Sequence, residues 1–317
     1  MNKRIGIVFD ETDIKVVSSE DGVLVKEKTV VLWNEKENKI VLYGEDVLNL
    51  ENKIGTNLSI IHPLEDGEIK NLKIFQNLIH LLFTQIKDEF KDADVIISKT
   101  SDNELVLDEF KAITSIYQPK NIRFEDSSKL IAIGAGININ DDYGKIILEV
   151  ENHCAKISVF VNGDTIASKQ LPYGEKYINQ KIKHHFKETK GIILDDYVVD
   201  KIKYGIGSVL KLKDDLEIVI SGIDTLSKEK KKILVSSSSV RKIFLDLFNH
   251  YKNEITKLLE TLPFYISTGI VKNGMSVVGS IGKIGGVNYF FKDFFDWPVE
   301  ISNSTEDAIL FGLLKIK

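Results

Sequence analysis

Short runs in which hydrophobic and polar residues alternate occur at two places in the chain, and each place predicts three strands. The first covers residues 4–33, where RIGIVFD, DIKVVSS and GVLVKEKTVVLW are separated by Asp, Ser and Gly residues. The second covers residues 144–172, where GKIILEVEN, AKISVFVNGD and TIASKQLP follow one another. Such runs, bounded by turn residues, are typical of strands, and Asn162-Gly163 is a strong tight-turn signal. The pattern therefore predicts two similar units of three strands each.

Other segments repeat apolar residues at spacings of three and four, which predicts helices. These segments are residues 72–90, 195–209, 238–262 and 304–315. In the last one Ser304 or Thr305 is placed to cap the helix, and Glu306 and Asp307 favour its positive end. Because strands and helices are mixed and two similar strand units occur, we predict an α/β fold of two lobes with a cleft between them.

Two low-complexity runs, KEKKK at 228–232 and SSSS at 236–239, are predicted to form solvated loops rather than binding patches. Hydrophobic residues make up 43% of the 317 residues and charged residues 28%, which is typical of a soluble globular protein. No run approaches the roughly 20 apolar residues of a membrane-spanning helix, and the start MNKRIGIVFD contains no signal-peptide core. We therefore expect a cytoplasmic protein.

Charge and cysteine content exclude several classes of partner. The net charge is −5 and the lysines are spread along the chain, which predicts no nucleic-acid partner. Cys154 is the only cysteine, so neither an intrachain disulfide nor a cysteine-cluster metal site can form. His62 and His80 have no third ligand nearby in sequence. We predict no metal site.

The segment IGTNLSIIHPLEDGEIKN, residues 54–71, resembles a characteristic segment of the bacterial actin-like MreB family. The matching residues are Asn57, Ile60, Pro63, Leu64, Asp66, Gly67, Ile69 and Asn71. Further resemblance follows in the family's order over nearly the whole chain. It includes KLIAIGAGI at 129–137, LPYGEKYINQKI, VDKIKYGIGS, GMSVVGSIGKIGGVNYF at 274–290, and the tail WPVEISNSTEDAILFGLL.

The resemblance implies an actin-like fold, which actin shares with chaperone ATPases and sugar kinases. Lobe I would comprise residues 1–144 plus 303–317, with a smaller insert at about 28–70. Lobe II would comprise residues 145–302, with a smaller insert at about 178–238. Each lobe would hold a mixed sheet with flanking helices.

The resemblance also implies a first phosphate-binding loop, from which this chain departs. The family's Asp, Gly and Thr fall on Val8, Asp10 and Glu11, and Thr12 follows. A neutral glycine-rich turn lets backbone N–H groups approach a phosphate, whereas two carboxylates repel it. When carboxylates lie close to a phosphate, the repulsion weakens phosphate binding by roughly several kcal/mol.

The second implied phosphate loop is altered in a different way. Glu149 stands where the family has Asp, an exchange that still permits contact with metal-bound water. The family's three glycines, however, fall on Glu151, Asn152 and His153, which carry side chains. The family's catalytic Glu falls on the Asp126-Ser127-Ser128 run, so that Asp126 would be a shifted acid.

The residues implied to contact adenosine match the family better. They are Gly174, Glu175, Asp200, Lys203, Gly279 and Ser280, of which the last replaces a glycine. Together with Asp10, Glu11, Thr12, Glu149 and Asn152 they define a degenerate nucleotide site.

Because each phosphate loop departs separately, we predict lost or strongly reduced ATPase activity. No cofactor is predicted, and ATP or ADP with Mg²⁺ would bind weakly at most. Our first hypothesis is a filament protein for bacterial cell shape or motility, which polymerises with itself or joins an active MreB-like homologue. The second is an active ATPase with an atypical site, in which Glu149, Asp13 and Asp126 perform the metal and base roles. The third is a non-polymerising scaffold or regulator with the same fold.

Members of the family often bind membranes through an N-terminal amphipathic helix or through an apolar loop after the first long helix. Here that loop is KDEFKDAD, residues 87–94, which is acidic and offers only Phe90 as a large apolar side chain. An anionic lipid surface would repel it. We therefore predict weak direct membrane contact and recruitment through a partner.

Overall fold

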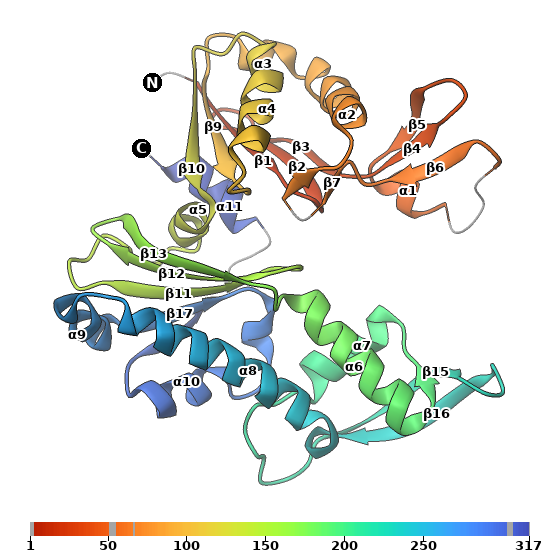
Figure 1. Cartoon of the computed structure of the whole chain (residues 1–317), viewed down its shortest axis with the longest axis vertical. Helices are drawn as coiled ribbons and strands as arrows, with labels where there is room; N and C mark the ends of the chain where they lie inside the picture. The colour runs from red at the N-terminus through yellow and green to blue at the C-terminus, as the bar shows by residue number, and fades with distance from the viewer. Residues whose placement is uncertain (1–2, 51–54, 66, 303–306, 317) are drawn as a thin grey trace. The chain divides into compact units, whose positions relative to one another are not determined.

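The computed structural model describes residues 3–50, 55–65, 67–302 and 307–316. The chain divides into two compact units, the first formed by Met1–Gly136 with Asp307–Lys317 and the second by Ile137–Glu306. Each unit contains a five-stranded sheet and a smaller three-stranded sheet. Helices flank the sheets of each unit (Figure 1).

The main sheet of the first unit has the strand order β10-β9-β1-β2-β3. Its strands are β1 (Arg4–Phe9), β2 (Asp13–Ser18), β3 (Gly22–Lys28), β9 (Asp94–Lys99) and β10 (Asn121–Asp126). The first three strands form an antiparallel meander, whereas β1, β9 and β10 run parallel to one another. The carboxyl ends of these three parallel strands therefore meet at one edge of the sheet.

Helices cover both faces of this sheet, because successive strand residues point to opposite faces. Ile7 and Phe9 pack in one core with helices α2 and α4. Val8 points the other way and packs with residues of α5 and α11, where the Arg4 guanidinium also donates to the carbonyl of Leu314 at 3.0 Å. The helices are α2 (Leu72–Thr84), α3 (Lys87–Phe90), α4 (Glu104–Ser115), α5 (Ser127–Gly134) and α11 (Ala308–Lys315).

A smaller sheet, ordered β5-β4-β6, extends the first unit. Its own core contains Val30, Leu32 and Val47, the last contributed by a short helix. The elements of this region are β4 (Val31–Asn34), β5 (Lys39–Tyr43), α1 (Glu45–Leu48), β6 (Leu58–Ile61), β7 (Leu64–Glu65) and β8 (Glu68–Ile69).

The second unit repeats the plan of the first. Its main sheet has the order β13-β12-β11-β17-β18, again an antiparallel meander of three strands beside two parallel ones. The strands are β11 (Lys145–Val150), β12 (Ala155–Val161), β13 (Asp164–Leu171), β17 (Met275–Val278) and β18 (Val299–Ser302). All six residues of β11 are buried, which places this strand at the centre of the unit.

Helices and a second small sheet, ordered β14-β15-β16, complete this unit. The helices are α6 (Glu175–Lys190), α7 (Asp196–Gly205), α8 (Ser237–Glu260), α9 (Phe264–Asn273), α10 (Val287–Phe295) and the 3₁₀ turn η1 (Ser280–Lys283). The small strands are β14 (Ile192–Ile193), β15 (Glu217–Asp224) and β16 (Lys230–Ser236). One continuous hydrophobic core joins both sheets and these helices.

The predicted duplication of three-strand units is confirmed by the shared strand order. Asn162 and Gly163 both adopt positive φ, as the tight turn between β12 and β13 requires. The segment at 54–71 does lead into a helix, and the Asn71 side chain caps it by accepting the N–H of Ile74 at 3.1 Å.

Other predicted elements need correction. The single helix expected at 72–90 is interrupted after Thr84, and the run at 22–33 is divided between β3 and β4, which belong to different sheets. The predicted loops are wrong as well: KEKKK enters β16, and the serine run forms the first turn of α8. The capping prediction for Ser304 or Thr305 lies outside the described residues.

Candidate functional site

The second implied phosphate loop is a tight hairpin turn between β11 and β12. The N–H of Glu151 donates to the carbonyl of Cys154 at 2.9 Å, and Asn152 and His153 form the tip. Neither tip residue has positive φ, so this turn does not need the glycines that the family has there.

This turn lies directly on the N-terminus of α6. The N–H groups of Glu175 and Lys176 donate to the carbonyls of Glu151 and Asn152 at 2.9 and 2.8 Å. Such N–H groups are the usual anion-binding donors of a helix N-terminus. Here the protein's own backbone occupies them, so they are not available to a phosphate.

Gly174 and Gly279 are required by close approaches around the same turn. A Cβ on Gly174 would lie 2.5 Å from the carbonyl oxygen of Asn152 and from the nitrogen of Cys154. Gly279 has φ of 110°, and a Cβ there would overlap the carbonyl oxygen of Val150. These glycines hold the end of β11 against α6 and η1, and their retention does not by itself indicate nucleotide binding.

An ion-pair cluster around the buried Lys203 side chain lies beside α6. The Lys203 side chain is 2% exposed, and its Nζ lies 2.9 Å from Oδ1 of Asp200 and 3.4 Å from Oε2 of Glu175. The Tyr204 hydroxyl donates to Oγ of Ser280 at 2.9 Å and lies 3.5 Å from Oε2 of Glu175. The cluster therefore ties α6, α7 and η1 together.

The charge state of this cluster is set by opposing effects. Burial lowers the pKa of Lys203, but the hydrogen bond from its ammonium group to Asp200 and the nearby Tyr204 and Glu175 outweigh burial and raise it overall. Burial raises the pKa of Tyr204. At neutral pH Lys203 therefore carries an ammonium group and Tyr204 a neutral phenol.

A groove of about 690 Å³ opens beside the cluster. Its walls come from α7 and β15, and two tyrosines and two aliphatic residues give it an apolar lining. The lining residues are Tyr197, Asp200, Lys201, Tyr204, Gly205, Ile218 and Val219. A groove of this size and character suits a flat aromatic group better than a charged one.

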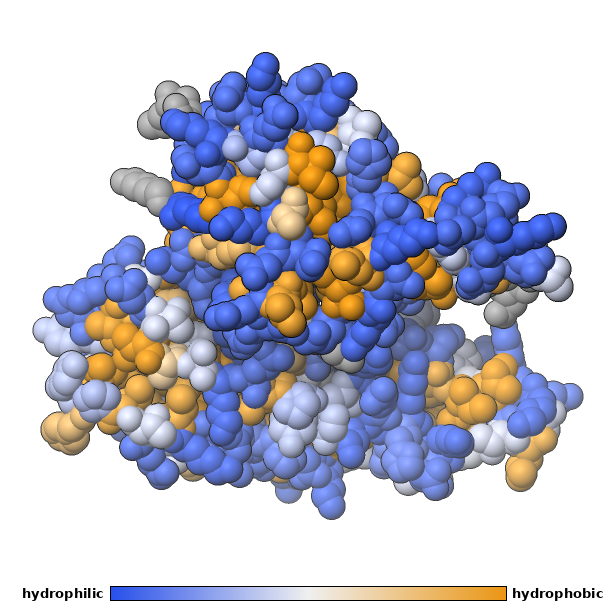
Figure 2. All heavy atoms as spheres, turned by 45° about the horizontal axis from the view of Figure 1, so that its top comes forward, coloured by the Kyte–Doolittle hydropathy of each residue, from blue (hydrophilic) through white to orange (hydrophobic). Residues whose placement is uncertain are grey.

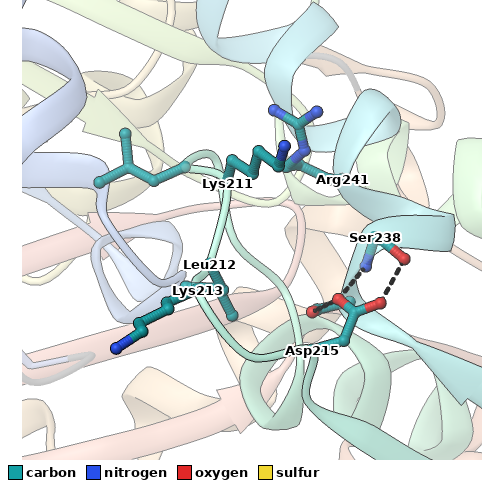
Figure 3. A pocket seen from close by; sticks show the side chains of 8 residues that line it. Lys211, Leu212, Lys213, Asp215, Ser238 and Arg241 are labelled. Atoms are coloured by element: carbon teal, nitrogen blue, oxygen red, sulfur yellow. Dashed lines mark hydrogen bonds between the residues drawn. The ribbon is translucent and has the colours of Figure 1, made fainter.

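A smaller pocket of about 260 Å³ lies at the N-terminus of α8, between this helix and the chain that precedes β15 (Figure 3). The Asp215 carboxylate accepts Oγ–H of Ser237 at 2.5 Å and N–H of Ser238 at 2.9 Å, and these bonds lower its pKa. Asp215 therefore caps the helix in place of an external anion.

In the first unit, hydroxyl groups of neighbouring threonines bind the first implied phosphate loop at Asp10. The Thr12 hydroxyl donates to Oδ2 of Asp10 at 2.6 Å, and the Thr29 hydroxyl donates to the Asp10 carbonyl at 2.6 Å. Asp13 forms an ion pair with Lys28 at 2.9 Å. With Glu11, the turn carries three carboxylates within four residues.

Asp126 ends β10 and caps α5. Its Oδ1 accepts the N–H of Lys129 at 3.0 Å. Because β1 and β10 are both parallel to β9, Asp126 lies at the same sheet edge as the turn that begins at Asp10. The carboxylate predicted as a shifted catalytic acid thus has a structural role in the first unit.

We expect Asp126→Ala to destabilise the first unit by about 1 kcal/mol, because an N-cap acceptor is lost. Asp126→Asn should be nearly neutral, since Asn caps helices as well as Asp does. Urea unfolding followed by the fluorescence of buried Trp33, in a Trp297→Phe background, measures both changes. If Asp126→Asn kept its stability but changed a measured hydrolysis rate, the carboxylate would have a chemical role beyond capping.

The structure brings together the predicted site residues of the second unit: Glu149, Asn152, Gly174, Glu175, Asp200, Lys203, Gly279 and Ser280 surround the carboxyl ends of β11 and β17. Those of the first unit, Asp10, Glu11, Thr12 and Asp126, lie at its own sheet edge. Sequence reasoning missed the role of Tyr204. Its position next to Lys203 was visible, but its partner Ser280 is 76 residues away.

The repeated five-stranded plan, with turns and glycines at the ends of the central strands, defines an actin-like fold. A crystal structure of MreB 5 of Spiroplasma citri bound to AMPPNP superposes with a TM-score of 0.83 at 23% identity, covering 98% of this chain and 95% of that one. A MamK double helical filament gives 0.69 at 13% identity, covering 98% and 96%.

The chain belongs to the MreB/Mbl family, whose protein model matches residues 2–317. The cell shape-determining protein Mbl of Bacillus subtilis is 21% identical over 313 residues, which are 97% of this chain and 93% of Mbl. The cell shape-determining protein MreB of Escherichia coli is 17% identical over 299 residues, 92% and 86% of the two chains. The resemblance noted in the sequence is thereby confirmed. Within the described ranges, no helix has the length and apolar character needed to cross a bilayer.

Proposed function

We propose that this protein is a cytoskeletal filament component that acts in bacterial cell shape or motility and has little or no ATPase activity. It assembles with itself or with an active homologue of the same family, in the cytoplasm. Membership of the MreB/Mbl family supports the cytoskeletal role. Relatives named cell shape-determining proteins and the fold shared with a filament of MamK support assembly.

The observation that carries the loss of ATPase activity is the contact between the hairpin turn and α6. Backbone carbonyls of Glu151 and Asn152 accept the two N–H groups that begin this helix. A phosphate at this helix N-terminus would have to displace both hydrogen bonds, because the two N–H groups already have backbone partners. The residues present in the second unit therefore do not fit a triphosphate.

Charge supports the same conclusion. The first turn contains Asp10, Glu11 and Asp13, and the second contains Glu149 and Glu151. In each unit, the carboxylates disfavour a polyanion at the turn that carries them unless cations intervene. The apolar groove with Tyr197 and Tyr204 remains able to accept a nucleoside weakly, because aromatic stacking needs no phosphate contact.

One observation favours the second hypothesis, an ATPase with an atypical site. Glu149 is only 3% exposed and is the last residue but one of β11, whose carboxyl end lies at the candidate site. Buried carboxylates at such strand ends are frequent in active sites. If hydrolysis is detected, Glu149→Gln should abolish it.

Calorimetric titration with ATP and ADP in the presence of Mg²⁺, beside pelleting and electron microscopy of the same sample, tests the proposal. We expect filaments without nucleotide, and a dissociation constant above about 1 mM, which corresponds to about −4 kcal/mol. A homologue that keeps the family's phosphate loops serves as the control. Tight binding with hydrolysis would establish the ATPase instead. A protein that stays monomeric, alone and with the homologue, would point to a non-polymerising scaffold.

A further inference from the structure

The small sheet β14-β15-β16 exposes aliphatic side chains on its outer face. Val219 and Leu234 are direct cross-strand partners and are 64% and 60% exposed. Ile193 and Ile223 also pair and are 48% and 37% exposed. Figure 2 shows hydrophobic residues gathered over this part of the second unit. A solvated sheet face is usually polar, and a contiguous exposed apolar patch marks an interaction surface.

The turn between β15 and β16 presents another apolar side chain. Leu226 is 92% exposed at the apex of this hairpin. The Asp224 carboxylate fixes the turn, because Oδ1 accepts the N–H groups of Leu226 and Ser227 at 2.9 and 3.0 Å. Oδ2 of Asp224 also binds the Lys231 ammonium at 2.9 Å. The exposed leucine is thus held on an ordered turn.

Lysines surround these apolar residues. Lys230 and Lys232 lie opposite Ile223 and Ser221 and share the outer face with Val219. Neither ammonium group has an ion-pair partner in the part of the chain that the structure describes. Segment 224–232 contains four lysines against two carboxylates, Asp224 and Glu229, and Glu217 lies at the far end of the face. The apex and the adjoining part of the face are therefore both apolar and cationic.

We propose that the β15–β16 hairpin, residues 217–236, docks onto an anionic lipid bilayer. Leu226 and the neighbouring aliphatic residues enter the interface, while lysine stems lie along it and place the ammonium groups among lipid phosphates. A symmetric contact with a second copy would bring the same lysines together, and a head-to-tail filament contact would need an acidic surface opposite these lysines. The loop at 87–94 cannot take this role through Phe90, whose side chain is fully buried.

Vesicle flotation of the full chain tests the proposal, because filaments alone sediment but do not float. We expect the protein to float with vesicles containing phosphatidylglycerol, much less with phosphatidylcholine alone, and less again at high salt. The paired change Lys230→Gln with Lys232→Gln should lower partitioning by about tenfold or more, as two ammonium groups near a charged surface predict. Leu226→Ser should lower it by about tenfold.

Leu105→Ser is the matched control, since Leu105 is 75% exposed in the first unit. It should leave partitioning unchanged. Equal binding to neutral and anionic vesicles, or hairpin variants that float as the wild type does, would overturn the proposal. Hairpin variants that lose assembly while wild-type protein fails to float would also overturn it, and would assign this face to a second copy of the chain.

Discussion

Replacing Gly134 or Gly312 by Ala should destabilise the first unit by about 3 kcal/mol or more, since added atoms in a packed core force backbone shifts. A Cβ on Gly134 would overlap the carbonyl oxygen of Ala308, and one on Gly312 would overlap that of Leu130. These positions are where helices α5 and α11 cross, and the obstacles are backbone atoms that cannot turn away. The helices would have to separate, which would open the core beneath Val8.

The chain offers a way to measure each unit separately. Its two tryptophans, Trp33 and Trp297, are buried in different units. Urea unfolding of the glycine variants in a Trp297→Phe background therefore reports the first unit alone. Gly205→Ala in the second unit, followed through Trp297 in a Trp33→Phe background, is the control, because a Cβ on this helical glycine meets nothing within 4 Å, and it should be neutral or slightly stabilising. Equal stability of Gly134→Ala and wild type would show that the helices do not approach so closely.

The antiparallel strands of the main sheets were predictable from the sequence because their signals are local, whereas β9, β10, β17 and β18 were not predicted. In 4–19 and 144–172, short apolar runs end at turn residues, and each run became a strand. The run at 22–33 was harder, since Thr29 and Val30 carry no strong turn signal where the chain passes from one sheet to another. Likewise, KEKKK reads as solvated by composition, yet pairing with β15 makes most of it a strand.

The candidate site was predicted only as a set of positions. That Asn152 would contact the start of α6 depends on a contact between residues 24 apart, Asn152 and Lys176, which no local pattern reveals. The same holds for Tyr204 and Ser280. The sequence shows that the loop glycines are substituted. It does not show that the backbone of the substituted turn binds the N–H groups at the start of α6. The exposed face at Val219 was also missed, because exposure depends on which face of the small sheet the core covers.

The second large effect is expected at the ion-pair cluster. Lys203→Met should destabilise the second unit by about 2 kcal/mol, because Glu175 and Asp200 lose their shared cation. This is less than the cost for a fully buried pair, since the Asp200 side chain is 51% exposed and water screens part of the lost interaction. Met fills nearly the same volume as the lysine stem, so the change reports charge rather than a cavity.

The cluster also predicts an alkaline dependence of stability. The folded pKa of Lys203 is raised above its ordinary 10.5, so its stabilising effect is present below that pH and is lost as the pH rises through the folded value. Tyr204, with its folded pKa raised above 10.0, acts in the same direction, because the folded state retains its proton longer. The unfolding free energy of the second unit should therefore fall above about pH 10. In the Lys203→Met variant, the unfolding free energy of the second unit should fall less steeply as the pH rises.

Trp297 fluorescence in a Trp33→Phe background measures this effect. Lys201→Met is the control, since Lys201 lies on the same helix but is exposed. It should change neither the stability nor its pH dependence appreciably. If Lys203→Met matched the control, the cluster would be energetically neutral, and the retained Lys and acids would have to be explained by ligand binding. That result would favour the nucleoside groove beside Tyr204 over a purely structural role for these residues.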